Sequence, residues 1–324
     1  MSQNWMRHFE LQILSENGQG ISLSDLKVTF NIEWTDTRWP RVGLVKIYNL
    51  SKDTASRILG TEFAKIKIIA GYDGLAPEYA AADVGVVRNI SEEDVGHVAG
   101  TNYGEIFSGD IRFTVTGRDN PTDTYVLIQA IDGHQAFLYA SMITTLSAGY
   151  TVADVHAAVL DSCKPFGITQ GITGEFPPTV FPRGRSFYHS TRDVMDNVAA
   201  QCGASWQFVS GQLNMIPTNK YIHEAIELNS RTGLIGMPQQ TMGAGVNVRC
   251  LINPNIRING LIGINQASVY RASLSNDEVK SLPSRVSETD NNGNLTVNGT
   301  LQQPSSIATD GVYIVKSIDY TGDT

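Results

Sequence analysis

The nine residues LKVTFNIEW, at positions 26–34, carry the pattern that most constrains how this chain can fold. Apolar and polar residues alternate along the whole segment, and the apolar ones are Leu26, Val28, Phe30, Ile32 and Trp34. Because successive side chains of a strand point to opposite faces, this alternation predicts a strand with one buried face. Such a strand needs a sheet with a core behind it, so a mainly β fold is expected.

Further strand signals fill the first 134 residues of the chain. They are RVGLVKIYNL, AKIKIIAGY, IFSGDIRFTV and TYVLIQAIDG. Between the first two, SKDTASRIL predicts one short helix with Ser51 as its N-cap. A polar insertion at 73–104 is long for a connection inside a compact domain. Short strands with long connections favour a barrel or a sandwich, which predicts a β domain over 1–134.

The middle of the chain has helical patterns. TVADVHAAVLDSC and STRDVMDNVAAQC each begin with a hydroxyl residue followed three positions later by Asp, a variant of the capping box. The two segments also match each other at a constant spacing, which is explained by a duplicated helical unit or by chance agreement between amphipathic helices. In ASWQFVSGQLNMIPT, the pair Ser210-Gly211 predicts a tight hairpin turn. A small α+β domain is therefore expected at 135–217.

The last third returns to strand patterns. GVNVRCLIN and IRINGLIGIN flank the pair Asn253-Pro254, a polar loop-like stretch follows at 275–310, and GVYIVKSIDYTGD ends the sequence. Because proline cannot donate to a central ladder, Pro254 is expected at a corner between two strands. Gly260 and Gly263 would allow a bend or bulge beside it. These signals predict a second β domain over 218–324 with a long loop at 275–310.

Composition excludes several classes of protein. Lys plus Arg number 24 and Asp plus Glu number 32, giving a net charge of −8, so binding to nucleic acid through a basic face is not expected. The N-terminal segment lacks the apolar core of a signal peptide, and no apolar run reaches the ~20 residues of a membrane span. The protein is expected to be cytosolic when made. The cysteines are predicted to be buried thiols rather than disulfide partners or zinc ligands, and they are Cys163, Cys202 and Cys250.

No pattern of a catalytic, cofactor-binding or metal site stands out in the sequence. The histidines form no HExxH motif and no helical metal-binding pair, and they are His8, His97, His134, His156, His189 and His223. The acidic run with Glu92, Glu93 and Asp94 would supply carboxylates for glycoside cleavage, but such a run in a polar loop is usually a solvated face. No G-x-S-x-G elbow, phosphate loop or calcium loop occurs. The chain is therefore predicted not to be an enzyme, with no cofactor.

Several segments, in their order along the chain, resemble phage tail baseplate hub proteins. The N-terminal group is RVGLVKIYNLSKDTASRI, KIKIIAGYDG, IFSGDI, GRDNPTDTYVLIQAIDGHQAF and TVADVHAAVL. The C-terminal group is GVNVRCLINPNIRINGLIGI, with its Asn-Pro corner, and GVYIVKSIDYTGDT, with its Gly-Asp-Thr ending. The family includes the late control D proteins, and it is related to the N-terminal region of type VI secretion spike proteins.

The resemblance implies a structural protein of the virion. Such hubs are homotrimers in which each chain supplies two tail-tube-like β-barrel domains, so that a threefold ring can meet a hexameric tail tube. The opposite face meets the trimeric central spike, and DNA passes through the lumen. The implied partners are therefore the tail tube protein, the spike protein, other baseplate proteins and the tape measure protein. The implied location is the tail baseplate, after assembly in the host cytoplasm, without sequence-specific nucleic acid binding or stable membrane insertion.

One functional alternative stays open on the sequence alone. A tail-associated hydrolase or glycan-binding module acting on the host envelope would use carboxylates from the long loops. A carboxylate pair separated by roughly 5 to 9.5 Å across a cleft would favour such an enzyme. The same loops buried against neighbouring chains would favour the hub.

Overall fold

The structure is a computed structural model of the chain. It describes residues 5–16, 18–60, 62–74, 102–218, 220–222, 225–230, 232–240, 245–265, 286–289, 295–298 and 311–324. The chain divides into two compact units. The larger unit comprises Asn4–Glu224, Ile252–Leu261 and Ile314–Thr324, and the smaller comprises Met1–Gln3, Ala225–Leu251 and Ile262–Tyr313.

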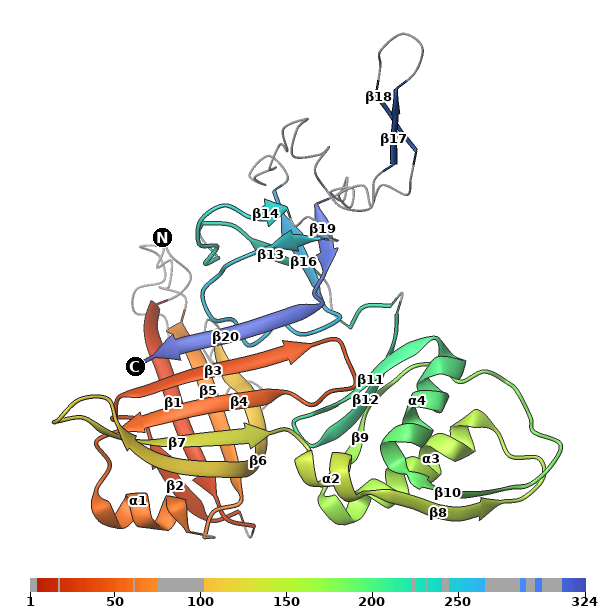
Figure 1. Cartoon of the computed structure of the whole chain (residues 1–324), viewed down its shortest axis with the longest axis horizontal. Coiled ribbons are helices and arrows are strands. Elements are labelled where there is room, and N and C mark those ends of the chain that lie inside the picture. The colour runs from red at the N-terminus through yellow and green to blue at the C-terminus, as the bar shows by residue number, and fades with distance from the viewer. Residues whose placement is uncertain are drawn as a thin grey trace, which may run out of the picture. The chain divides into compact units, whose positions relative to one another are not determined.

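The larger unit is built on an eight-stranded antiparallel sheet with the order β2-β1-β5-β6-β7-β4-β3-β20 (Figure 1). Its strands are β1 (Trp5–Leu14), β2 (Gly20–Leu23), β3 (Val28–Thr35), β4 (Val42–Tyr48), β5 (Lys65–Gly74), β6 (Asn102–Arg118), β7 (Thr124–Ile131) and β20 (Ser317–Asp323). Helix α1 (Lys52–Leu59) connects β4 to β5, and Ser51 caps it by accepting a hydrogen bond from the Thr54 amide. The expected strand at LKVTFNIEW and the expected helix are both confirmed.

Strand β6 carries the sheet around a corner. Its first half, up to Asp110, pairs with β5, and its second half, from Asp110 to Arg118, pairs with β7. Both pairings contain a register shift, the device by which a strand bends out of one sheet layer into another. Figure 1 accordingly shows β1 and β5 running across the direction of β3, β4 and β7. The core lies between these layers and includes the fully buried Leu11, Ile13, Ile32, Val45, Ile66, Ile68, Phe107 and Ile128.

The last strand of the sheet comes from the end of the sequence. β20 pairs with β3, with Ser317 opposite Thr35 and Asp323 opposite Thr29. Thr324 holds the end of this strand, because its hydroxyl accepts from the Val28 amide at 2.8 Å and donates to the Leu26 carbonyl at 2.9 Å. In the part of the chain that the structure describes, the end strands β2 and β20 do not pair, so the sheet is open. The mainly β expectation is thus confirmed, but no closed barrel is observed.

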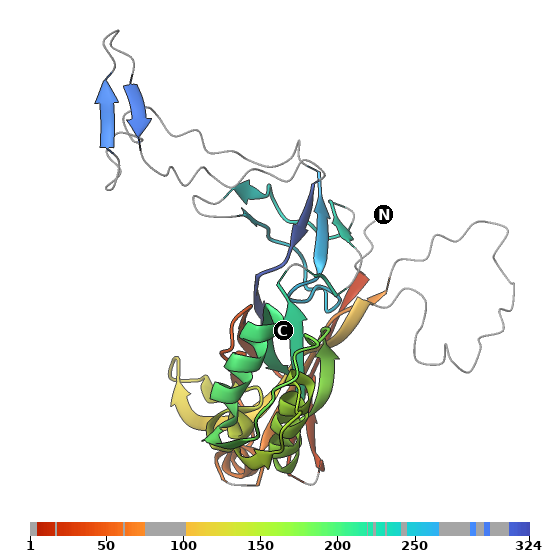
Figure 2. The same ribbon diagram turned by 90° about the vertical axis from the view of Figure 1, so that its right-hand side faces the viewer.

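The insert between β7 and residue 218 packs two helices between small sheets. Its elements are α2 (His134–Tyr139), β8 (Ser141–Leu146), α3 (Val152–Cys163), the 3-10 turn η2 (Lys164–Phe166), β9 (Thr169–Thr173), β10 (Arg185–Ser190), α4 (Thr191–Cys202), β11 (Ala204–Val209) and β12 (Gln212–Pro217). β8 pairs with β10, β11 pairs with β12, and β9 runs parallel to β12. Figure 2 shows α3 and α4, which pack against each other. The α+β character expected for this region is observed.

The helix ends and the hairpin follow the sequence signals. Thr151 and Asp154 form a complete capping box at the start of α3, and Ser190 caps α4 by accepting from the Asp193 amide. Between β11 and β12, Ser210 and Gly211 have φ values of 51° and 74°. Two positive φ values in a two-residue hairpin loop identify a type I′ turn, whose twist matches that of the flanking strands.

The smaller unit contains short strands. They are β13 (Ile226–Leu228), β14 (Gln239–Gln240), β15 (Val246–Asn247), β16 (Leu261–Ile264), β17 (Val286–Thr289), β18 (Leu295–Asn298) and β19 (Val312–Ile314). The sheet β13-β16-β19 has β13 parallel to β16, and two antiparallel pairs, β14-β15 and β17-β18, accompany it. Most of the two long segments, 73–104 and 275–310, lies outside the described residues.

The corner at Pro254 differs from the expected one. Pro254 lies in a turn closed by a hydrogen bond from the Ile256 amide to the Asn253 carbonyl, as a proline corner requires. The long strands expected on either side are not formed. Within residues 245–265, only the two residues of β15 and the four of β16 lie in paired strands. Gly263 lies inside β16 opposite Glu227, whose carboxylate would collide with a Cβ at that position.

The division expected from the sequence, at 134 and 217, does not coincide with these compact units. The C-terminal strand β20 belongs to the sheet of the first β region, although the sequence places it in 218–324. A second tube-like domain over 218–324 stays a prediction. Such a domain has to be compatible with the pairing of β20 with β3, a strand of the first β region. Among the described residues, no helix combines the length and apolarity required to cross a bilayer.

Candidate functional site

The candidate residues considered in the sequence do not converge on one place. His8 lies in β1 and stacks on Tyr103, His134 begins α2, His156 is buried in α3 and His189 lies in β10. His97, His223 and the acidic run with Glu92, Glu93 and Asp94 lie outside the described residues. Within the described ranges, no group of three or more His, Cys, Asp or Glu side chains is placed to hold a metal ion.

The three cysteines are free thiols in different environments. Cys163 is fully buried at the end of α3, as expected, whereas Cys202 and Cys250 are only partly buried. Burial raises the pKa of all three thiols, to about 11 for Cys163. Because the thiolate is the nucleophile and the metal ligand, a raised pKa keeps these side chains unreactive near neutral pH.

His156 gives the stability of the chain a dependence on pH. It is 4% exposed, its Nε2 has no hydrogen-bond partner, and burial lowers its pKa below the ordinary 6.5. As the pH falls through 6.5, the imidazole therefore becomes protonated in the unfolded chain before it does so in the folded chain. The free energy of unfolding falls as the pH drops below that value. In urea titrations between pH 7.5 and 5, we expect His156→Leu to lose less stability than the unchanged protein. Equal losses would contradict this account, since the carboxylates titrate alike in both proteins.

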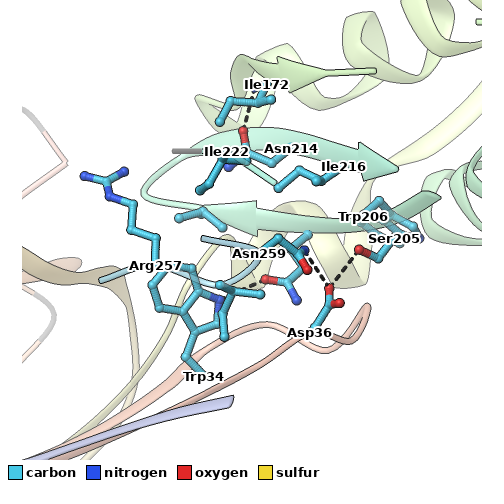
Figure 3. Close-up of a pocket in the computed structure, with 13 residues that line it drawn as sticks. Trp34, Asp36, Ile172, Ser205, Trp206, Asn214, Ile216, Ile222, Arg257 and Asn259 are labelled. Atoms are coloured by element: carbon cyan, nitrogen blue, oxygen red, sulfur yellow. Dashed lines mark hydrogen bonds between the residues drawn. The ribbon is translucent and has the colours of Figure 1, made fainter. Parts of the chain in front are cut away.

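A polar junction built around Asp36 joins four segments of the larger unit, and Figure 3 shows the contacts of Asp36 with Ser205 and Asn259. Asp36 follows β3 directly, and its Oδ1 accepts hydrogen bonds from Ser205 Oγ of β11 at 2.7 Å and from Asn259 Nδ2 at 3.1 Å. Its Oδ2 accepts from Lys316 Nζ, just before β20, at 2.6 Å. The Lys316 ammonium also donates to Asn259 Oδ1 at 2.8 Å. One carboxylate therefore ties β3 to the insert, to residues 252–261 and to β20.

Hydrogen bonds and the Lys316 charge keep this junction ionised in spite of its burial. Burial favours the neutral acid, but hydrogen bonds from Lys316, Ser205 and Asn259 outweigh it and hold the pKa of Asp36 below its ordinary value. Asn259 contributes in a second way, since its φ of 60° lies in the left-handed region that asparagine tolerates better than most residues. Its backbone amide donates to the Val315 carbonyl, and its carbonyl accepts from the Ile222 amide.

The cavity at this junction is too small for a substrate. It encloses about 30 Å³ and is lined by apolar side chains such as Ile216 and Ile258 beside the polar ones. Since a single water needs roughly 10–15 Å³ of such volume, the cavity has room for about two or three waters. Next to it, Trp34 Nε1 donates to Gln207 Oε1 at 2.9 Å, and Gln207 Nε2 donates to the Thr35 carbonyl. The arrangement positions segments of the fold.

A second, deeper connection between sheet and insert is the ion pair of Arg41 and Asp132. Both side chains are almost fully buried, at 3% and 2% exposure, and Arg41 Nε and Nη2 donate to Asp132 Oδ2 at 3.0 and 2.5 Å. The same carboxylate accepts from the backbone amide of Ser210 at 2.7 Å, in the turn of the β11-β12 hairpin. Arg41 also lies over the Trp34 ring, 4.7 Å from its centroid. The pair therefore fixes the insert hairpin against the corner of the sheet.

Sequence reasoning did not single out these junction residues. Asp36, Arg41, Asp132 and Lys316 are isolated charges near strand ends, and no spacing connects them. The one available signal was position: each lies directly before or directly after a strand, where a charge has to be either solvated or paired. Only the tertiary structure decides between these two outcomes.

Comparisons with known proteins give distant structural likenesses. No family model matches the sequence, and no curated protein matches it. A 43 kDa tail protein of prophage MuSo2 from Shewanella oneidensis is 11% identical, with 96% of this chain and 93% of that chain covered and a TM-score of 0.44. A tail protein from Neisseria meningitidis MC58 is 10% identical, with 98% and 92% covered and a TM-score of 0.46. Prophage tail protein gp18 from Listeria monocytogenes EGD-e is 7% identical, with 75% and 67% covered and a TM-score of 0.35. The chain is similar to these tail proteins, but the sequence identities and TM-scores are too low to assign their function to it.

Proposed function

We propose that the protein is a structural hub of a phage tail baseplate. In this role three copies form a ring that joins a hexameric tail tube to a trimeric central spike and surrounds the path of the DNA. The observation that carries the proposal is the sequence resemblance, whose segments keep the family's order from the start of β4 to the end of β20. A shared order over most of a chain is harder to obtain by chance than any one of its short segments.

The architecture supports a role in assembly. The larger unit is an extended antiparallel sheet with an insert fixed to it by buried and half-buried polar contacts, as a rigid structural module requires. The two prominent polar clusters, around Asp36 and around Arg41, are fully engaged in holding segments together. The net charge of −8 suits a protein that surrounds DNA without gripping its phosphates.

The ring explains how a threefold protein would meet a sixfold tube. If 1–134 and 218–324 each contribute one tube-like module, three chains present six modules in a pseudo-sixfold arrangement. Such a ring uses heterologous contacts, the first module of one chain against the second module of the next, and these close when the rotation per chain is one third of a turn. The partners would then be the tail tube, the spike, other baseplate proteins and the tape measure protein.

Cryo-electron microscopy of intact particles that carry this chain tests the proposal. We expect three copies around the tail axis at the end of the tube, with six similar β modules facing it and the DNA path at the centre. A dimer, or a ring with one tube-like module per chain, would contradict the proposal. The hydrolase alternative makes a different prediction: a clear zone on a peptidoglycan zymogram that disappears when Glu92, Glu93 and Asp94 are replaced.

A further inference from the structure

A cleft in the insert has the features of a binding site and takes no part in the contacts described above. It lies between β10 and α4, encloses about 150 Å³, and is called the insert cleft below. Its lining residues come from α3, α4, β10 and the segments before α3 and before β10. An engineered apolar cavity of about 150 Å³ binds benzene, so the insert cleft has room for one ring-sized group.

The floor of the insert cleft is apolar and aromatic. Tyr150 stacks on Phe181, with ring centroids 4.6 Å apart, and meets Phe187 edge to face at 6.4 Å. The remaining floor consists of valines from the two helices: Val152, Val155, Val194 and Val198. These side chains belong to the hydrophobic core of the insert, so the floor is held rigidly. A preformed apolar floor favours an apolar group that leaves water to enter it.

Two rows of polar side chains flank the mouth. On β10, Arg185 and His189 are exposed and stand on the same side of the strand as buried Phe187, because alternate residues share a face. On α4, Asp193, Asn197 and Gln201 follow each other at a spacing of four residues and form a stripe along the opposite rim. Amide side chains on such a rim can donate to and accept from a peptide backbone.

The charge at the mouth indicates what the bound group carries beside its apolar part. The Arg185 guanidinium lies 4.9 Å from the centroid of the Phe187 ring, and within the described residues neither it nor the neighbouring Arg183 forms an ion pair. The rim carboxylate Asp193 already accepts from the Ser190 hydroxyl and lies 4.0 Å from Arg192. The unmatched charge at the mouth is therefore positive, and a carboxylate complements it.

We infer that the insert cleft binds a peptide segment of a partner protein in which an aromatic residue is followed by an acidic one. The aromatic ring fills the space above Phe187 and the valines, the carboxylate pairs with Arg185, and Asn197 and Gln201 hold the backbone. A free C-terminal carboxylate is not required, since an Asp or Glu side chain supplies the same charge. This site does not depend on the hub role, because it uses no residue of the Asp36 or Arg41 contacts.

Methyl NMR of the full-length chain tests the site with defined probes. The probe peptide is acetyl-Ala-Phe-Glu-Ala-amide, and its controls carry Ala in place of Phe or Lys in place of Glu. We expect the probe to shift the methyl signals of Val152, Val155, Val194 and Val198. Loss of the ring should weaken binding about tenfold or more, since a buried phenyl group contributes that much through area alone.

Two variants and one matched control complete the experiment. Arg185→Glu reverses a rim charge and should weaken the probe about tenfold. Asn197→Tyr, on the exposed side of α4, should block the mouth without disturbing the core. Arg112→Glu makes the same charge change on an exposed residue of β6 and should leave binding unchanged. The inference is overturned if the probe shifts none of the valine methyls at millimolar concentration, if the Ala control binds as well, or if Arg112→Glu weakens binding as much as Arg185→Glu.

Discussion

Replacing Arg41 by Met is expected to lower the free energy of unfolding by about 3–5 kcal/mol, the range measured when one partner of a buried ion pair is removed. The reason lies in what remains. Asp132 is 1% exposed, and burial raises its pKa while the Arg41 charge and hydrogen bonds oppose that rise. Without Arg41, the carboxyl keeps, among the described residues, hydrogen bonds from the backbone amides of Ser210 and Gly211 at 2.7 and 3.4 Å, and two backbone bonds do not compensate a buried charge.

Chemical denaturation of the parent and three variants measures this effect. Arg38→Met is the matched control, because Arg38 also pairs with an aspartate, Asp196, but both side chains are more than a third exposed. An exposed pair contributes less than about 1 kcal/mol, so this variant should unfold near the parent. The double change Arg41→Met with Asp132→Leu removes both charges and should recover part of the loss. If Arg41→Met and Arg38→Met cost the same, the buried pair does not hold the insert to the sheet.

Truncating Phe107 to Ala is expected to cost a similar amount, about 3–5 kcal/mol, through the cavity it leaves. Phe107 is fully buried in β6 at the corner of the sheet, and two glycines make room for its ring. A Cβ added at Gly43 of β4, or at Gly109 of β6, would lie 2.8 Å from ring carbons of Phe107. The corner is therefore packed by one large side chain against two positions that cannot carry one.

A double-mutant cycle separates this packing from general destabilisation. Gly43→Ala alone should cost about 1–3 kcal/mol, because it overpacks a filled site. In the Phe107→Ala background the same change fills vacated space, so its cost should shrink or change sign. Ala158→Gly, on a partly buried helical position of the insert, serves as a control that should cost about 1 kcal/mol in either background. Additive costs for Gly43 and Phe107 would show that the ring does not occupy the space above Gly43.

The sequence predicted local structure better than long-range pairing. The alternation in LKVTFNIEW, the caps at Ser51, Thr151 and Ser190, and the Ser210-Gly211 turn all depend on neighbours within a few residues, and each is found where it was expected. Strand β1, which lies in the N-terminal segment, was not predicted from the sequence. The pairing of β20 with β3 was not predicted either. Which strand pairs with which is decided by the whole sheet and not by the segment itself.

The polar contacts were out of reach for a related reason. Lys316 and Asp36 are 280 positions apart, and nothing in either neighbourhood marks the other as its partner. The insert cleft was equally hidden, since its aromatic residues are indistinguishable in sequence from core residues. Its rim residues are ordinary helix and strand surface until β10 and α4 face each other. Residue patterns gave no catalytic motif. The expectation of a hub protein came from the family resemblance and not from residue patterns.

The pairing of β20 with β3 has a consequence for how the protein is made. During synthesis, β3 leaves the ribosome nearly 300 residues before its partner, since Thr29 pairs with Asp323 and Thr35 with Ser317. Until residues 317–323 emerge, one edge of the sheet keeps its backbone donors and acceptors unpaired, and such edges pair readily with other nascent chains. Closing so long a loop is also slow. We therefore expect a chaperone or an early-binding neighbour that shields β3 to raise the yield of folded protein.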